Sequence, residues 1–186
     1  MKLIVGLGNP GRQYEGTRHN VGYAVLGELA RRLGAGPPKA KFHGELVETL
    51  IGDQKVLLLC PLTYMNRSGL SVRAAKDYYQ VADNDLLVVC DDINLPLGKL
   101  RFRARGSSGG QKGLEDIIQR LGTQEFSRLR IGVGAPPEGW DWADYVLSRF
   151  RPEERDQIQQ AVVEAAEAVE TWVRDGIEAC MNQFNG

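Results

Sequence analysis

The chain has 186 residues, 42% of them hydrophobic, which is enough for one well-filled core and short for two, so we expect a single domain over residues 1–186. The formal net charge is −1, and Cys60, Cys90 and Cys180 lie far apart without a Cys-x-x-Cys pair, which indicates structural thiols in a reducing compartment. No apolar run has the length of a signal h-region or a membrane span, so we expect a soluble cytoplasmic protein with no membrane partner.

The first predicted element is a buried strand that ends in an irregular loop. Residues 3–5 form a short apolar run, and three glycines and a proline then keep the chain from entering a helix at once. The loop holds Asn9 and His19. Because open α/β sheets bind ligands at the carboxyl ends of their strands, we expect a functional site at this loop.

Residues 6–11 also match the Gly-x-Gly-x-x-Gly fingerprint of dinucleotide-binding folds. In those folds the third glycine already lies in the helix that binds the pyrophosphate, whereas Pro10 and the glycines here delay helix entry until about Val21. A ribose-binding acid is also lacking at the expected distance, because Glu28 falls inside the next helix and Glu45 lies too far along. The sequence therefore disfavours a dinucleotide site.

A helix and a hairpin follow this loop. Apolar residues spaced by four predict a helix over Val21–Leu33, which Gly34 ends. An alternating strand over Lys41–Ile51 and a continuous apolar strand over Lys55–Cys60 are joined at Gly52-Asp53, which is typical of a hairpin turn.

The next helix leads into a third buried strand. Asn66 or Ser68 is suited to cap this helix, because both residue types accept hydrogen bonds from free backbone N–H groups. The apolar run Leu86–Cys90 then predicts a strand that carries Asp91 and Asp92 at its carboxyl end.

The segment Lys99–Arg105 alternates strictly between basic and apolar residues, so a strand here has one basic face. Between Lys99 and Arg130 eight basic residues stand against three acidic ones, and from Arg151 to Gly186 three basic residues stand against eight acidic ones. We therefore expect the first region to attract a polyanion and the C-terminal region not to do so.

The remaining elements complete the pattern of an α/β fold. After a flexible Gly106–Gly110 loop we expect a helix over Gly113–Leu121, a strand over Arg128–Val133, a loop over residues 135–142 and a long amphipathic helix from about Pro152. Strands that alternate with helices, together with one hairpin, predict a single three-layer α/β domain with a mixed, mostly parallel central sheet flanked by helices. The carboxyl ends of its three buried strands then meet at one rim.

Four residues at that rim form a candidate catalytic cluster. Asn9, Asn66 and Asp91 each follow a predicted buried strand, and His19 closes the first loop. A histidine kept basic by a carboxylate can take a proton from water, and asparagine amides can position a substrate or donate to an oxyanion. These groups suit hydrolysis of an activated carbonyl, although caps, packing and turns also use such residues, and spacing alone leaves both interpretations open.

The chain carries a set of motifs in order over nearly its whole length, namely Gly6–Gly11, Tyr14, Thr17–Asn20, Pro61–Gly69, Asp91–Pro96, Gly109–Gly113 and Leu129–Gly134. Together they resemble the bacterial-type peptidyl-tRNA hydrolase family. Several separate motifs at matching spacing are much more specific than one glycine fingerprint. The resemblance implies hydrolysis of the ester that joins a peptide to the 3′ end of a tRNA released prematurely from the ribosome, and hence recycling of the tRNA.

The resemblance also implies a role for each residue of the cluster. His19 matches the family's general base, which activates a water molecule, and Asp91 matches the carboxylate that orients it. Asn9 and Asn66 match the amides that hold the tRNA 3′ end and the ester carbonyl. The resemblance implies no metal or other cofactor and no obligate protein partner, and it suggests a monomer.

Further residues match the substrate-binding positions of the family. Tyr14 and Met65 match residues that line the cleft, where an aromatic ring can stack on the terminal base, although plain packing of the cleft wall is the alternative. Arg103 and Arg130 match a basic clamp on the tRNA 5′ phosphate. The predicted tRNA-binding residues are Arg101, Arg103, Arg105 and Arg130.

One motif departs from the family. Many members carry a His-Asn pair after the two glycines of the flexible loop, and this chain has Gln111-Lys112 there. Gln111 can still donate a hydrogen bond and Lys112 brings positive charge toward RNA, so we expect both to bind substrate. The Gly106–Gly110 loop and the segment Trp140–Tyr145 are the candidates for closing over the peptide.

Two other functions fit parts of the sequence. A non-catalytic RNA-binding protein of the same fold needs the basic face but neither a base nor its orienting acid, so the presence of His19 and Asp91 argues against it. A magnesium site for phosphodiester cleavage would use Asp91 and Asp92, but adjacent residues at a strand end point to opposite sides.

Overall fold

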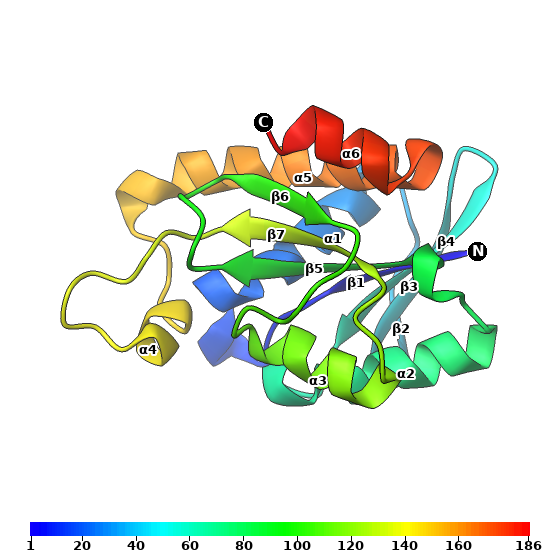
Figure 1. Ribbon diagram of the computed structural model, residues 1–186, viewed down its shortest axis with the longest axis horizontal. Coiled ribbons are helices and arrows are strands. Elements are labelled where there is room, and N and C mark those ends of the chain that lie inside the picture. The colour runs from blue at the N-terminus through cyan, green and yellow to red at the C-terminus, as the bar shows by residue number, and fades with distance from the viewer.

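A seven-stranded mixed sheet runs through the middle of the computed structural model, which describes residues 1–186 (Figure 1). The strands are β1 (Lys2–Gly6), β2 (Lys39–Lys41), β3 (Gly44–Ile51), β4 (Gln54–Pro61), β5 (Leu86–Asp92), β6 (Leu100–Arg103) and β7 (Ser127–Gly132). Their order across the sheet is β2-β3-β4-β1-β5-β7-β6; the four central strands β4, β1, β5 and β7 are parallel, and the outer strands β2, β3 and β6 pair antiparallel. The predicted α/β class with a mixed central sheet is confirmed.

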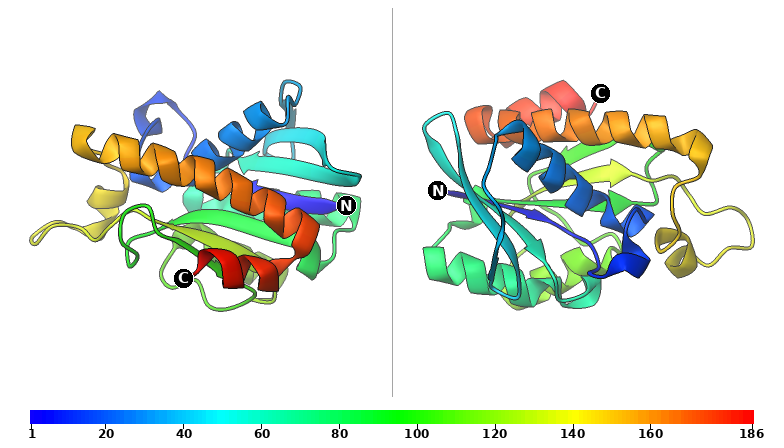
Figure 2. Two further views of the ribbon diagram at one scale, coloured as in Figure 1. Left: turned by 90° about the horizontal axis from the view of Figure 1, so that it is seen from above. Right: turned by 180° about the vertical axis from the view of Figure 1, so that it is seen from behind.

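Helices cover both faces of this sheet and make it the middle of three layers (Figure 2). The helices are α1 (Val21–Arg32), α2 (Ser68–Tyr79), α3 (Lys112–Leu121), α4 (Trp142–Val146), α5 (Arg155–Asp175) and α6 (Ile177–Phe184). α1, α5 and α6 pack on one face, α2 and α3 pack on the other, and the short α4 lies beyond the end of the strands (Figure 1). None of the helices combines the length and the apolar character that a membrane span requires.

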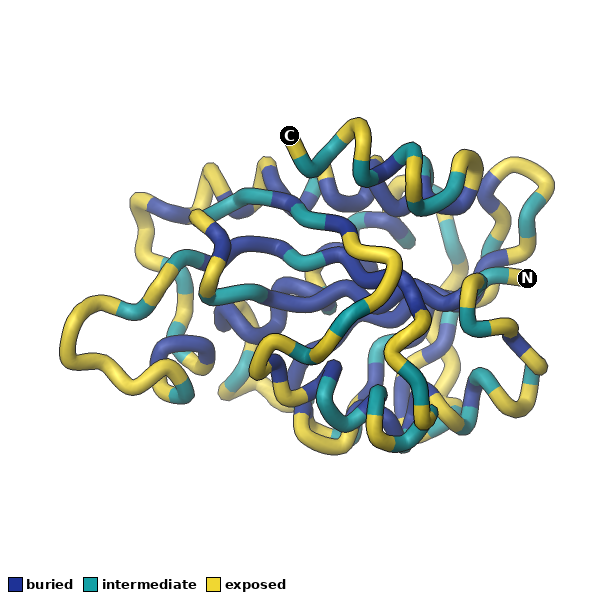
Figure 3. Tube along the Cα trace, viewed as in Figure 1, coloured by how far each residue is buried: buried dark blue, intermediate teal, exposed yellow.

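Successive side chains of the central strands enter two separate cores. Ile4 and Val89 belong to the core under α1 and α5, whereas Leu3 and Val88 belong to the core under α2 and α3. This alternation explains why these strands are continuous apolar runs, since both faces of the sheet are covered. Figure 3 shows the central strands buried along most of their length, whereas the outer strand β2, several residues of β3, the loops and the outer sides of the helices are exposed.

The alternating segment predicted as one strand over Lys41–Ile51 is two strands. β2 ends at Lys41, and Phe42 and His43 form a tight turn into β3 with φ of 55° and 56°. Neither turn residue is a glycine or an asparagine, although Gly44 follows them directly, and the ring of Phe42 packs on α2 with its centroid 5.4 Å from that of Tyr78. The molecule therefore has two successive hairpins where we expected one.

The cap predicted for the second helix is also wrong. A single 3-10 turn, Met65–Arg67, precedes α2, and neither Asn66 nor Ser68 caps the helix. Instead the carboxylate of Asp116, on α3, accepts a hydrogen bond of 2.8 Å from the backbone N–H of Gly69. The free N–H groups of α2 are thus satisfied partly by a neighbouring helix, a contact with no local signal in the sequence.

The C-terminal region contains two boundaries that the pattern does not indicate. The long helix starts with a 3-10 turn over Pro152–Glu154 and ends at Asp175, because Gly176 has φ of 89° and turns the chain into α6. The loop predicted over residues 135–142 extends to Asp141, whose side chain caps α4 through the N–H of Ala143 at 3.2 Å.

Candidate active site

A cavity of about 260 Å³ lies beside the carboxyl ends of β5 and β7. In Figure 1 this end of the sheet is on the left, next to α4. The cavity is lined by residues from five segments of the chain, among them His19, Asp91, Gln111, Lys112, Arg130 and Trp142. The predicted meeting of strand ends at one rim therefore produces a real hollow with titratable groups in it.

His19 and Asp91 form a buried pair at the floor of this cavity. The Nδ1 atom of His19 lies 2.9 Å from both carboxylate oxygens of Asp91, and the side chains are 9% and 3% exposed. An ionised carboxylate only accepts hydrogen bonds, so the ring nitrogen that faces it carries the proton. In the neutral ring the other nitrogen, Nε2, is then an acceptor, available to the cavity that His19 lines.

Asn9 is held by contacts from two other segments. The side chain of Asn20 accepts from the backbone N–H of Asn9 at 2.8 Å and donates to its carbonyl at 3.0 Å. The Oδ1 atom of Asn9 accepts from the N–H of Met65 at 2.7 Å. The first two bonds hold the backbone of Asn9 and the third orients its side-chain amide, whose Nδ2 donor has no protein partner and lies next to the buried Met65.

The Gln111 side chain joins helix α3 to Asp91. Its Oε1 accepts from the N–H of Leu114 at 2.8 Å and thereby caps α3, while its Nε2 donates to Asp91 Oδ1 at 3.1 Å. The same nitrogen lies 3.4 Å from the sulfur of Met65. We predicted from the sequence that Gln111 binds substrate, but in the structure both its polar atoms have partners within the protein.

Lys112 and Trp142 stand together at the rim of the cavity. The ammonium of Lys112 lies 6.0 Å from the centre of the Trp142 ring and 3.6 Å from a carboxylate oxygen of Glu115. Both Lys112 and Trp142 are exposed. A flat aromatic surface beside a cation suits a ring system or an anion, and Trp142 belongs to the segment Trp140–Tyr145 that we predicted as a candidate for closing over the peptide.

The arginines of the basic region divide into two groups. Arg128 is buried and donates to four backbone carbonyls, those of Gly106, Ser107, Gln124 and Phe126, and its burial lowers its pKa to about 10. Arg130 lines the cavity, donates to the carbonyls of Ser107 and Ser108 at 3.2 and 2.9 Å, and lies 3.8 Å from Asp92. These two side chains hold the glycine-rich loop, so the count of basic residues overstates the free positive charge.

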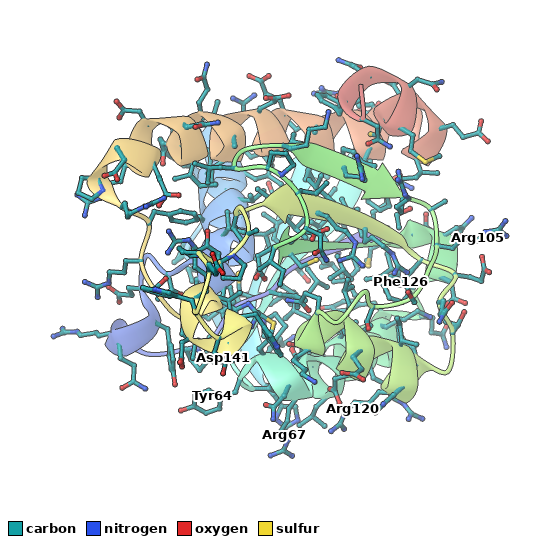
Figure 4. All side chains as sticks on the ribbon, turned by 60° about the vertical axis from the view of Figure 1, so that its left-hand side comes forward. Tyr64, Arg67, Arg105, Arg120, Phe126 and Asp141 are labelled. Carbon is teal, nitrogen blue, oxygen red and sulfur yellow. The ribbon has the colours of Figure 1, made fainter.

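Three further predicted tRNA-binding residues lie along or beyond the edge strand β6. Arg101 is opposite Arg130 in the sheet, and Arg103 is exposed next along the strand. Arg105 follows the end of β6 and is 4.0 Å from Glu125. Figure 4 places Arg105 at the far side of the molecule from Asp141, which borders α4. The basic face is thus a strip that starts at the cavity and runs away from it.

Besides the three arginines of that strip, four predicted site residues are not among those that line the cavity, namely Asn9, Tyr14, Met65 and Asn66. Asn66 is exposed, without a hydrogen bond, on the 3-10 turn that follows Met65. Tyr14 is half-buried and packs edge to face against Tyr64, with ring centroids 6.4 Å apart. Tyr64 is exposed with φ of 63° and ψ of 155°, a strained conformation for a residue other than glycine. Tyr14 and Asn66 flank the Asn9 and Met65 side of the site.

The structure supports neither a magnesium site at Asp91 and Asp92 nor a dinucleotide site at the glycine fingerprint. Asp91 faces His19 and Gln111, whereas Asp92 accepts from the N–H of Asn94 at 2.7 Å and pairs with Arg130, so the two carboxylates have separate partners and share no centre. No three His, Cys, Asp or Glu side chains of the chain lie together as a metal-binding group. The glycine fingerprint is followed by 3-10 turns and not by a helix, which begins at Val21, as the sequence analysis predicted.

Comparison with known proteins places this geometry in a family. The family model for peptidyl-tRNA hydrolase matches residues 3–186. The chain belongs to the peptidyl-tRNA hydrolase family. It is 51% identical to a peptidyl-tRNA hydrolase of Rhodopirellula baltica over 185 residues, which cover 100% of this chain and 97% of that protein, and 48% identical to one of Lachnospira eligens, with both chains fully covered.

A crystal structure of the family has the same fold. The peptidyl-tRNA hydrolase of Acinetobacter baumannii superposes with a TM-score of 0.94 at 37% identity, over 100% of this chain and 95% of that one. The resemblance expected from the sequence motifs is therefore confirmed. The contacts of Asn20 with Asn9 and of Arg18 with Glu154 were not predicted. Both residues lie within the motif Thr17–Asn20, but nothing in the sequence indicates so distant a partner for Arg18.

Proposed function

We propose that this protein hydrolyses the ester between the peptide and the 3′ end of tRNA in peptidyl-tRNA, with His19 as general base. The observation that carries the proposal is the His19–Asp91 pair, whose second ring nitrogen is free at a cavity in a member of the peptidyl-tRNA hydrolase family. Since peptidyl-tRNA arises during translation, we propose that the protein acts in the cytoplasm, as a monomer and without a cofactor.

The proposed reaction begins with a water molecule bound to Nε2 of His19. The nitrogen takes a proton as the water oxygen bonds to the ester carbonyl carbon, and Asp91 stabilises the imidazolium that forms. The carbonyl becomes a tetrahedral oxyanion, to which the free Nδ2 of Asn9 can donate. When the bond to the ribose oxygen breaks, the proton passes from the imidazolium to that oxygen, which releases tRNA and the carboxylic acid of the peptide, and the acid then loses its proton to solvent.

Binding of tRNA is proposed to use two surfaces on either side of this centre. Tyr14 and Asn66, together with Met65, lie on the Asn9 side and would contact the 3′ end. Lys112 at the rim is placed to attract the phosphates nearest the ester. Arg130 starts a strip of arginines that would follow the acceptor arm; the others are Arg101, Arg103 and Arg105.

The test is release of an N-blocked amino acid from acyl-tRNA, measured with and without a chelator. We expect turnover in both conditions, and a separate tRNA-binding measurement shows that the protein engages its substrate. Binding without turnover would instead favour the RNA-binding protein of the same fold. Turnover abolished by the chelator and restored by a metal ion would contradict a reaction carried out by side chains alone.

A further inference from the structure

Gln111 is the only side chain besides His19 that forms a hydrogen bond with the carboxylate of Asp91. It is buried, with 8% of its surface exposed. The assignment of its two polar atoms is unambiguous on chemical grounds, because the N–H of Leu114 requires an acceptor and therefore faces Oε1 at 2.8 Å. The amide nitrogen consequently faces Asp91 Oδ1, at 3.1 Å, and donates to it.

The backbone around Gln111 is fixed from both sides. Its side chain caps α3, and the preceding loop is held by Arg128 and Arg130 through the carbonyls of residues 106–108. Next to it, Gly113 leaves no room for movement, since a Cβ there would come within 2.6 Å of both Leu7 and Met65. The amide donor is therefore aimed at Asp91 by the fold and does not wait for substrate.

We propose that Gln111 is a positioning residue, which orients the Asp91 carboxylate and limits its pull on the His19 ring; this inference rests on the proposed function of His19. A carboxylate with a second donor has its plane fixed, so the proton on Nδ1 and the direction of Nε2 are fixed with it. The second donor also draws negative charge away from His19. Without it, Asp91 would stabilise the imidazolium more strongly, and the free base would be present only at higher pH.

The other charged groups around the cavity do not replace the action of Gln111 on Asp91. Asp92 on β5 and Arg130 on β7 face each other, and Lys112 on α3 lies near Glu115. α4 presents only Trp142 and Val146 to the cavity. Arg18, beside His19 in sequence, directs its guanidinium to Glu154. A change at Gln111 alone is therefore expected to act on His19 through Asp91.

Gln111→Ser and Gln111→Glu separate the two functions of this side chain. Serine caps a helix well but does not reach Asp91, whereas glutamate keeps the capping oxygen and puts a second carboxylate against Asp91. For Gln111→Ser we expect wild-type thermal stability, kcat lower by about tenfold to a hundredfold, as for loss of a hydrogen bond to a charged group, and little change in KM. The acid limb of the kcat profile should move to higher pH, and further in Gln111→Glu.

Gly122→Ala is the matched structural control. Gly122 ends α3 with φ of 72°, so alanine destabilises the same helix from its other end without touching the cavity. We expect this variant to melt earlier while keeping the wild-type pH profile. If Gln111→Ser instead loses stability like Gly122→Ala and keeps the wild-type kcat and pH profile, Gln111 is only a helix cap and the proposal is overturned.

A double-mutant cycle shows whether Gln111 acts through Asp91. In an Asp91→Asn background, Gln111→Ser should change the residual kcat by less than about twofold, because coupled residues are not additive. If Gln111→Ser lowers kcat in the Asp91→Asn background as much as it does in the wild-type protein, the proposal is overturned. Failure of the positioning role of Gln111 can be told apart from failure of the proposed function. The latter would appear as absent turnover in the wild-type protein or as unchanged turnover in His19→Ala.

Discussion

Gly8 shows how closely single residues are constrained around the site. A Cβ at this position would lie 2.8 Å from the ring of Tyr23 and 2.9 Å from Oδ1 of Asn20. The Tyr23 hydroxyl donates to the carbonyl of Pro61, so the ring is held and cannot yield freely. Asn20 in turn is the residue that clamps Asn9. The glycine is therefore required by a close approach of side chains and not by an unusual φ.

Gly8→Ala should lower both stability and activity. We expect a loss of about 1–3 kcal/mol in the free energy of unfolding from overpacking, and a fall in turnover because Asn9 shifts with Asn20. Urea denaturation and the ester assay measure the two effects. Gly27→Ala is the control, since Gly27 is exposed within α1 with open space around it, and this change should stabilise by about 0.5–1 kcal/mol. Equal changes in stability and turnover for Gly8→Ala and Gly27→Ala would contradict this explanation.

The reactivity of the cysteine thiols gives a second prediction about single residues. Burial raises the pKa of Cys90 and Cys180 to about 12, so at neutral pH almost no thiolate is present to react. We expect both thiols of the folded protein to resist iodoacetamide, and all three cysteines to react after unfolding in urea. Rapid labelling of native Cys90, located by mass spectrometry, would show that the rim opens more than the structure indicates.

At the scale of elements, one ion pair links the loop that carries His19 to the start of α5. Arg18 Nη2 lies 2.6 Å from Glu154 Oε1, both side chains are buried, and the guanidinium sits 4.2 Å from the centre of the Tyr145 ring. Arg18 also donates to Ser148 and to the carbonyl of Arg149. Because His19 follows Arg18 directly, the position of His19 depends on a segment more than a hundred residues away.

Glu154→Gln should destabilise the protein by about 3 kcal/mol, because it leaves a buried guanidinium without its counter-charge. Burial raises the pKa of Glu154, but the N–H of Arg151 and the charge of Arg18 outweigh it and hold the pKa below its usual value. A lowered pKa means that the ion pair stabilises the fold above pH 4.3, the approximate value for an unfolded glutamate, and that this stabilisation is lost as pH falls below it.

Urea unfolding at pH 7 and pH 3 measures this loss directly. The difference between wild type and Glu154→Gln should be large at pH 7 and much smaller at pH 3. Glu153→Gln is the control, because Glu153 is exposed and forms a surface ion pair with Arg151 at 3.7 Å. This change should alter the free energy of unfolding by less than about 0.5 kcal/mol. A difference between wild type and Glu154→Gln that does not depend on pH would contradict the ion-pair explanation.

At the scale of the whole molecule, charge is distributed unevenly over the three layers. The arginine strip lies on β6 and β7 at one edge of the sheet, whereas α5 and α6 carry the acidic C-terminal region across one face (Figure 2). A polyanion would meet the strip and avoid the acidic helices. The cavity, at the start of the strip, is where the end of such a polyanion would arrive.

Binding of tRNA should therefore weaken with salt in proportion to the phosphates contacted. We expect each of Arg101→Ala and Arg103→Ala to reduce the slope of log K against log salt by about 0.7–0.9, the value for one lost phosphate contact. Arg174→Ala, an exposed change on α5, should leave the slope unaltered. Filter binding over a range of salt concentrations gives the slopes, and identical slopes for all four proteins would show that the strip does not bind the acceptor arm.

Much of this arrangement was predictable because it depends on local patterns. The continuous apolar runs before Gly6 and Asp91 required strands buried on both faces, and parallel strands bring their ends to one rim, so His19 and Asp91 were expected to meet. Contacts between segments that are far apart in the sequence leave no pattern from which they could be predicted. Asp116 caps α2, Arg18 pairs with Glu154, and Arg128 is buried among carbonyls, although each looks like an ordinary surface charge in the sequence.

The most direct test of the central claim is turnover of N-blocked acyl-tRNA by His19→Ala, measured with and without added imidazole. If His19 is the general base, the variant should retain tRNA binding, lose at least about a hundredfold in turnover, as for removal of a general base, and regain part of it when imidazole fills the space beside Asp91. Turnover by His19→Ala equal to that of the wild type, with no response to imidazole, would contradict the account.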